Sequence, residues 1–319
     1  MRLSQLIGIA LLCACLGGGI PSSASAQILE SVGTRALGMG GAFVAVASDA
    51  SATWWNPAGL AAGPFLDLTV ARASTGAGDR APAWRDRTSW FAIATPPFGF
   101  GYYRFRLTDI QPFSPTDQAA AGREDRGVGI PARSLSASQL GVTVVQTVTS
   151  GIHAGSTLKY LRGTPSGGDT QGRFDLDAGV LAIAGSLRVG AVVRNVTRPE
   201  FNAPGAALRL PRQFRVGAAF DPERATGVPL TISLDADVRA YDTGTGERRV
   251  VAAGAEQWFK AKRFGVRGGG RFNTVGLQER SVTAGATVAV RSGLYVEGYV
   301  VRGGPADEQG WGLAARISF

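Results

Sequence analysis

The residues with catalytic potential gather around the single histidine, His153. Ser156 and Lys159 follow it with the Ser-x-x-Lys spacing of penicillin-recognising enzymes. That chemistry needs both side chains on one face of a helix, whereas the local pattern is a strand, which sends positions 156 and 159 to opposite faces. His153 could meet Asp175 or Asp177 across neighbouring strands in a hydrolase, but nothing in the sequence favours that arrangement. We therefore expect a protein that is not an enzyme.

Cofactor and metal sites are not expected either. One histidine cannot form a histidine cluster, and a metal site needs several ligands. The stretch GMGG, residues 38–41, is similar to a glycine-rich phosphate loop. No strand precedes it, Phe43 stands where the last glycine should be, and no Lys-Ser/Thr follows. The sequence thus predicts no bound metal and no cofactor.

The formal charge of +9 comes almost entirely from arginine, since the chain has three lysines, Lys159, Lys260 and Lys262. Nucleic-acid-binding proteins gather their positive charge on one face. Here the arginines are scattered at strand ends and at alternate positions, so we expect no nucleic-acid partner. Anionic lipid headgroups or a polar lumen account for them better.

The elements that carry these charges alternate between apolar and polar residues with the period of a β-strand. The clearest case is the C-terminal segment, residues 310–319. Its apolar face consists of Trp311, Leu313, Ala315, Ile317 and Phe319. No stretch of about 18 apolar residues follows the N-terminal segment, so the sequence predicts no membrane helix. Barrel strands remain compatible with this pattern, because their hydropathy signal is weak and alternating.

About fourteen such strands are predicted, an even number as expected for a bacterial outer-membrane barrel. Tight and long connections alternate along the chain, as inner turns and outer loops should. The longest loop spans residues 107–138 and is polar. The predicted strands are residues 65–73, 87–95, 98–106, 139–148, 152–162, 173–183, 187–195, 212–220, 230–240, 248–259, 264–272, 280–290, 294–302 and 310–319.

Residues 1–26 have the order of a secretory signal: Arg2, an apolar core over residues 6–16, then the small residues 24–26. A lipoprotein signal ending before Cys15 is the alternative. With cleavage after Ala26, Cys13 and Cys15 both leave with the signal, so no disulfide is expected. We assign residues 1–26 to the signal, 27–64 to a plug and 65–319 to the barrel.

Residues 33–60 form an apolar stretch rich in glycine and alanine, which favours close-packed turns and short helices. Asn56 precedes Pro57, an arrangement typical of a helix cap followed by proline at the first helical position. We expect a tight turn at Asn56, Pro57, Ala58 and Gly59.

Charged residues of both signs fall on faces that we predict to point into the lumen, where they must pair or be hydrated. A barrel of this width is too wide to be filled by its own side chains, so a plug or water must occupy it. We expect these residues to anchor the plug, with a solute path as the alternative. They are Lys159, Asp175, Asp177, Asp235, Asp237, Arg239, Glu256, Arg267, Arg271 and Glu297.

The stretch GMGGAFVAVASDASATWWNPAGLA, residues 38–61, resembles the N-terminal hatch of FadL-type outer-membrane proteins, and more closely that of the PorV/PorQ-like branch. Weaker likenesses, such as LRLPRQFRVGAAF over residues 208–220, extend along the chain. The resemblance implies an all-β, antiparallel transmembrane barrel of about fourteen strands, integral to the outer membrane, with an N-terminal plug (hatch) in its lumen.

Two functions are implied by this resemblance. The PorV/PorQ likeness, which we favour at this point, implies docking or shuttling in protein secretion, with secretion-system proteins as partners. The FadL likeness implies transport of hydrophobic small molecules such as long-chain fatty acids, released through a break in the wall at a kinked strand. Proline and glycine weaken strand pairing, so the candidates for that break are Pro96, Pro97, Gly99 and Gly101. The terminal Phe319 looks like the signal read by the barrel assembly machinery.

Overall fold

The computed structural model describes residues 25–26, 31–77, 83–110, 132–165, 168–203, 206–243, 246–276, 279–304 and 308–319. The proposed signal segment lies outside the described residues, apart from Ser25 and Ala26. These two residues form β1 (Ser25–Ala26), which pairs in parallel with β10 (Ala206–Arg209).

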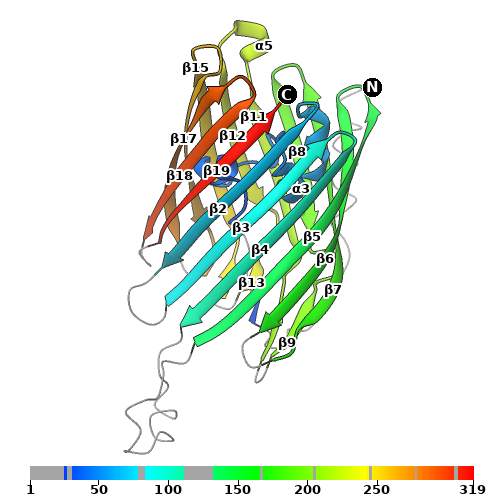
Figure 1. The fold of residues 1–319 in the computed structure, drawn as a ribbon, viewed down its shortest axis with the longest axis vertical. Helices are drawn as coiled ribbons and strands as arrows, with labels where there is room; N and C mark the ends of the chain where they lie inside the picture. The colour runs from blue at the N-terminus through cyan, green and yellow to red at the C-terminus, as the bar shows by residue number, and fades with distance from the viewer. Residues whose placement is uncertain are drawn as a thin grey trace, which may run out of the picture.

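Fourteen antiparallel strands close into one barrel (Figure 1), which confirms the predicted fold class. Every predicted strand is present. In order around the wall they are β2 (Asp67–Ala77), β3 (Ala83–Thr95), β4 (Phe98–Ile110), β5 (Ala132–Thr149), β6 (Ile152–Pro165), β7 (Gln171–Ala184), β8 (Leu187–Arg194), β11 (Gln213–Phe220), β12 (Leu230–Asp237), β15 (Val250–Phe259), β16 (Phe264–Asn273), β17 (Arg280–Arg291), β18 (Leu294–Gly304) and β19 (Gln309–Ser318).

The two ends of the barrel differ in their connections. Tight turns such as Pro96-Pro97 and Gly185-Ser186 lie at the end where the chain terminates, together with the short helix α5 (Glu223–Thr226) (Figure 1). Longer connections lie at the other end. Outer-membrane barrels have short periplasmic turns and long extracellular loops. We therefore refer to the two ends as the periplasmic and the extracellular end.

The strand faces have the polarity of a membrane barrel. On β12, Leu234 points outward and is 56% exposed, whereas Asp235 points inward and is 1% exposed. The same outward belt continues around the wall, for example at Val282, Val300 and Leu313. A soluble barrel would bury its apolar face inside. The apolar exterior is confirmed.

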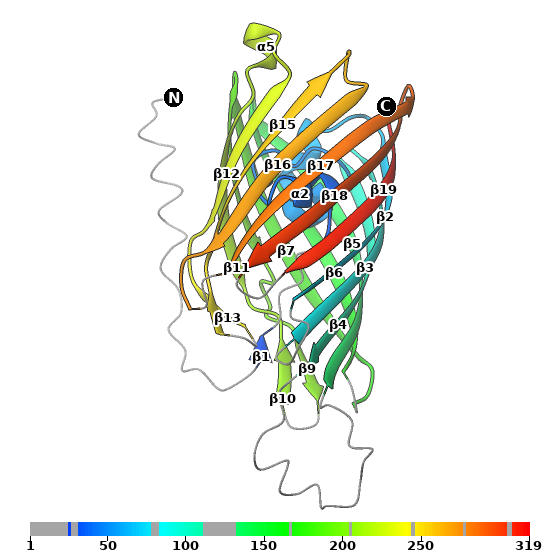
Figure 2. The ribbon, with the colours of Figure 1, turned by 90° about the vertical axis from the view of Figure 1, so that its left-hand side faces the viewer.

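The hatch lies inside the barrel (Figure 2) and consists of α2 (Thr34–Gly38), α3 (Ala52–Trp55) and the 3₁₀ helix η1 (Pro57–Ala62). α2 packs against β16 to β19, while α3 and η1 pack against β4 to β7. No helix in the described residues is long and apolar enough to cross a membrane. Two small hairpins lie near the extracellular end, β9 (Glu200–Ala203) with β10, and β13 (Tyr241–Thr243) with β14 (Gly246–Arg248).

The longest predicted loop is shorter than expected at both ends. β4 continues to Ile110 and β5 begins at Ala132, because the backbone ladder between them runs on through polar residues such as Thr108 and Ser134. A polar outward face does not end a strand once it has left the apolar belt, since ladder bonds use only backbone groups. Residues 111–131, the centre of that loop, lie outside the described residues.

Candidate functional site: the hatch and its seat in the lumen

Asn56 is fully buried and organises the middle of the hatch. Its Oδ1 accepts a hydrogen bond from the backbone N–H of Ala58 at 3.1 Å, and Pro57 is the first residue of η1. Its Nδ2 donates to the carbonyl oxygens of Val44 at 2.9 Å and of Val180, on the wall strand β7, at 3.1 Å. The structure thus places Asn56 as a cap that also joins the hatch to the wall.

Glycines of the wall make room for this turn. A Cβ added to Gly155 would lie 2.5 Å from the carbonyl carbon of Pro57, and one added to Gly190 would lie 2.7 Å from the carbonyl oxygen of Val44. A Cβ on Gly179 would collide with Oδ1 of Asn56. These glycines were not among the residues predicted to hold the plug. Their signal was present, because a glycine inside a strand often marks close approach of another backbone.

Glycine is equally required within the turn. A Cβ at Gly59 would overlap the carbonyl oxygen of Ala47, and Ala58 beside it has no exposed surface. Small residues here let two passes of the hatch backbone touch. The predicted turn of Asn56 to Gly59 is therefore buried and closely packed.

Asp235 is a second anchor. Its Oδ2 accepts hydrogen bonds from the backbone N–H groups of Phe43 at 2.7 Å and of Val44 at 2.8 Å. Because Val44 also accepts from Asn56, Asp235 and Asn56 hold the same hatch residue from two sides. Two backbone donors on one buried carboxylate are strong, charge-assisted bonds.

Asp237, two residues further along β12, has a different role. It binds Arg215 of β11, with Oδ1 2.7 Å from Nε, and accepts from the Tyr241 hydroxyl at 3.1 Å and from the Val250 N–H at 2.9 Å. These contacts join wall strands to the β13–β14 hairpin and do not involve the hatch.

A chain of ion pairs begins where α2 is joined to the wall strand β15. Arg35 of α2 binds Glu256 of β15, with Nη2 2.6 Å from Oε2, and lies 3.7 Å from Asp49 of the hatch. Glu256 also binds Arg267, at 3.3 Å. The chain continues through pairs that join Arg267 to Glu297, Glu297 to Arg316 and Arg316 to Asp67, at 3.7, 3.0 and 3.7 Å. Charges of alternating sign thus run from the hatch to β2.

Arg35 keeps its positive charge in this setting. Burial alone would lower the pKa of its guanidinium, but Glu256 and Asp49 outweigh that effect and raise the pKa above its ordinary value. A buried charge is tolerated only when it is paired and hydrogen-bonded. The Arg35–Glu256 pair therefore acts as a fixed clamp between the hatch and β15.

Lys159 lies in a separate cluster nearer the extracellular end. Its Nζ is 2.9 Å from Asp175 and 2.7 Å from Asp177, and it donates to Oδ1 of Asn195 at 3.0 Å. The two carboxylates in turn accept from the N–H groups of Asn195 and Thr197, which follow β8. Lys159 thus ties the start of the β8–β11 connection to the inner wall. Arg271 faces the lumen as well, where it binds Glu308 and Ser281.

Two sequence expectations need correction. Arg239 does not line the lumen, because β12 ends at Asp237 and the Arg239 side chain is exposed beyond it.

The predicted break in the wall is not present either. Within the described residues β4 pairs with both β3 and β5 without a register shift, and Pro96-Pro97 lies in the preceding turn. Gly99 and Gly101 keep their backbone pairing with both neighbouring strands. Their inward faces leave room for the side chains of Leu60 and Tyr103.

His153 is not part of a triad. It lies opposite Leu181 on β7, while Asp175 pairs with Lys159. Its Nδ1 is 3.0 Å from the Thr147 hydroxyl near the periplasmic rim.

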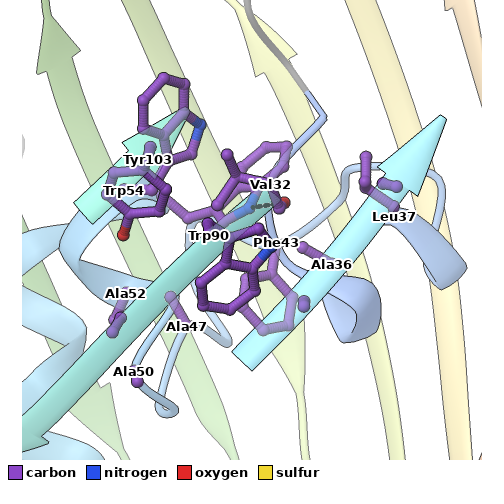
Figure 3. Close-up of a cluster of buried hydrophobic side chains, with 14 of the residues drawn as sticks. Val32, Ala36, Leu37, Phe43, Ala47, Ala50, Ala52, Trp54, Trp90 and Tyr103 are labelled. Carbon is purple, nitrogen blue, oxygen red and sulfur yellow. Dashed lines mark hydrogen bonds between the residues drawn. The ribbon is translucent and has the colours of Figure 1, made fainter. Parts of the chain in front are cut away.

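Aromatic side chains cover the inner wall of β3 and β4 beside the hatch (Figure 3). The ring of Trp54, from α3, lies 5.3 Å from Tyr103 and 5.4 Å from Phe105, and Trp90 lies 5.9 Å from Tyr103. Leu107, Leu135 and Leu161 continue the surface. The inner wall therefore has an aromatic patch on β3 and β4, whereas the inward faces of β12 to β18 carry many charged residues.

A sequence family described as "F plasmid transfer operon, TraF, protein" matches residues 165–237, much less than half of the chain. No curated protein sequence matches.

Solved structures match along nearly the whole chain. The Ralstonia pickettii toluene transporter TbuX is 13% identical, with 91% of this chain and 99% of that chain covered and a TM-score of 0.66. The CymD monoaromatic hydrocarbon channel is 12% identical, with 91% and 98% covered and a TM-score of 0.67. A Pseudomonas aeruginosa FadL homologue is 11% identical, with 91% and 99% covered and a TM-score of 0.63. With its hatch, its fourteen strands and its apolar outer belt, the chain has the fold of the FadL-like outer-membrane β-barrels.

Proposed function

We propose that this protein is a channel for hydrophobic small molecules in the outer membrane, with the hatch as its movable gate. The observation that carries the proposal is the aromatic cluster in which Trp54 of the hatch meets Trp90, Tyr103 and Phe105 of the inner wall. Barrels that pass ions and polar solutes have polar, water-filled interiors. An aromatic inner surface next to the hatch suits an apolar solute.

The attachment of the hatch supports a gating role. Its contacts with the charged wall are side-chain bonds from a few residues, chiefly Arg35 to Glu256 and the Phe43 and Val44 amides to Asp235. The wall is a continuous backbone ladder. Water can replace the former as the hatch moves, whereas opening the ladder would expose backbone groups to lipid at several kcal/mol each. The hatch is thus the part that can shift without opening the wall.

The comparisons support this reading over protein secretion. TbuX is described as a toluene transporter and CymD as a monoaromatic hydrocarbon channel. The docking role that the N-terminal resemblance favoured has no such support. The TraF match is too short to assign a function.

Uptake by whole cells tests the proposal. The full chain is expressed in a host that lacks its own FadL-type channel, and uptake of radiolabelled toluene and of oleate is followed in separate assays. We expect the protein to raise the uptake of at least one probe several-fold, and Trp54→Ala with Tyr103→Ala to reduce that gain. Trp311→Ala removes an outward tryptophan and is the matched control. Unchanged uptake of both probes in cells with correctly folded protein would reject the channel.

A further inference from the structure

Six exposed arginines lie on the outer wall of β2, β3, β4 and β6. Arg85 and Arg87 lie near the extracellular start of β3, Arg104 lies at the middle of β4 and Arg106 lies beyond it toward the extracellular end. β3 and β4 lie side by side in the front wall of Figure 1. Arg72 and Arg162 flank this group. The strand register therefore gathers arginines that appear scattered along the chain.

The register places two of them face to face. Arg87 is the direct partner of Arg106, and Arg104 is opposite Ser89, which is opposite Arg72. Like charges directly opposite each other destabilise a sheet. No outward position of β2 to β6 with a described side chain carries a carboxylate, and none of the six arginines has an ion pair in the described part of the chain. Among the residues that the structure describes, these arginines therefore have no counter-charge on the outer wall.

Hydroxyl groups complete the surface. On β5, the outward residues Ser138 and Ser136 are the direct partners of Arg104 and Arg106, and Ser138 is also opposite Arg162. Arginine presents a planar set of donors that matches phosphate oxygens, and serine can donate to the same oxygens. The arginines and serines thus form a band with many hydrogen-bond donors and positive charges on one continuous surface.

An aromatic row borders the band on its periplasmic side. Two residues before Arg104 lies Tyr102, which is opposite Phe91 on one side and Leu140 on the other. Leu140 is opposite Tyr160, whose ring lies 5.0 Å from that of Phe174. Aromatic girdles mark the boundary between the hydrocarbon core and the headgroups. The arginines therefore lie on the headgroup side of that boundary, in the outer leaflet.

We propose that this arginine patch, made of Arg85, Arg87, Arg104 and Arg106, binds the phosphate groups of a phosphorylated glycolipid of the outer leaflet. The lipid's acyl chains lie along the apolar belt on the periplasmic side of Tyr102. Its phosphates accept hydrogen bonds from the guanidinium groups on the extracellular side. The bound anion relieves the repulsion between Arg87 and Arg106. Neither step depends on what the lumen transports.

Binding is tested with the full, folded protein in detergent, with bis-phosphorylated lipid A as the probe and dephosphorylated lipid A as its comparison. We expect Arg87→Gln with Arg106→Gln to weaken binding of lipid A by about ten-fold or more, the loss of two charge-assisted contacts. Wild-type protein should bind the dephosphorylated lipid as weakly as the variant does. Heat-modifiable mobility on gels verifies that each variant is folded.

The matched control is Arg280→Gln with Arg302→Gln. It removes two outward arginines from β17 and β18 at the same end of the barrel. Binding of lipid A by this control should equal that of the wild type. An equal loss in both double variants would show a general attraction of anions and overturn the proposal. Displacement of lipid A by millimolar inorganic phosphate would also overturn it, because the site would then select a free anion.

Discussion

Arg35 in the hatch and Glu256 in the wall share three contacts, with Nε 3.0 Å from each carboxylate oxygen and Nη2 2.6 Å from Oε2. The two residues are 221 positions apart in the chain, and both are buried or nearly so. This pair is the strongest single link between the hatch and β15. Breaking a buried pair by removing one partner typically costs about 3–5 kcal/mol, because the other charge is left uncompensated.

Replacing Glu256 should therefore loosen the hatch. We expect Glu256→Gln to increase hydrogen exchange at the α2 amides, residues 34–38, while exchange in the wall strands is unchanged. Hydrogen-exchange mass spectrometry in detergent measures both. Glu308→Gln removes a partner of Arg271 away from the hatch and is the control. Equal exchange in α2 of the two variants would contradict the clamp.

A second prediction concerns the glycine seat of Asn56. Gly179→Ala adds a methyl group that collides with Asn56 Oδ1, so we expect the hatch to shift or to lose that cap, which typically costs about 0.5–2 kcal/mol. Proteolysis of the hatch should become faster. Gly268→Ala places its methyl 3.7 Å from the nearest atom and should leave the rate unchanged. If Gly179→Ala is as resistant as the wild type, the wall does not hold Asn56 in place.

The strands were predictable because each depends on a local pattern. The alternation of Leu234 with Asp235 is enough to define two faces, and the tight turns fix the order of strands around the barrel. The end of β12 was not predictable from alternation, which continues through Arg239 after the ladder has stopped.

The pairing partners of the charged lumen residues could not be predicted from the sequence, for a physical reason. Glu256 and Asp235 both lie on the inward face of their strands, but alternation cannot tell which of them meets Arg35 and which meets the Phe43 amide. Those contacts depend on the path of the hatch, and that path is set by wall glycines such as Gly179 that give no charge pattern. The arginine patch was missed for the same reason, because register across four strands decides it.

The outward face of β12 allows a test of the membrane assignment. Leu234→Arg places a charge in the apolar belt and should destabilise the folded protein by about 2–4 kcal/mol if the site is near the midplane. Urea unfolding in lipid vesicles measures the loss. Leu234→Met, which preserves volume and polarity, should change stability by less than about 1.5 kcal/mol. Equal stability of the two variants would mean that lipid does not contact this face.

Phe319 has two separable roles. Its backbone extends the β19–β2 ladder that closes the barrel, since its N–H donates to the Leu66 carbonyl at 2.9 Å and its carbonyl accepts from the Leu66 N–H at 3.1 Å. Its ring, 66% exposed, packs beside Gly293 in the β17–β18 turn. Deleting Phe319 removes both features, whereas Phe319→Ala keeps the backbone bonds and removes the ring alone.

If the aromatic ring is an assembly signal, Phe319→Ala should reduce the amount of folded protein in the outer membrane as severely as the deletion does. Phe319→Tyr should restore it, because the terminal aromatic ring is kept. Heat-modifiable mobility of outer-membrane fractions measures the folded amount, and refolding of the purified chain into detergent provides the control. Refolding does not use the assembly machinery, so Phe319→Ala should refold like the wild type there. A variant that assembles normally in cells would leave Phe319 with barrel closure as its role.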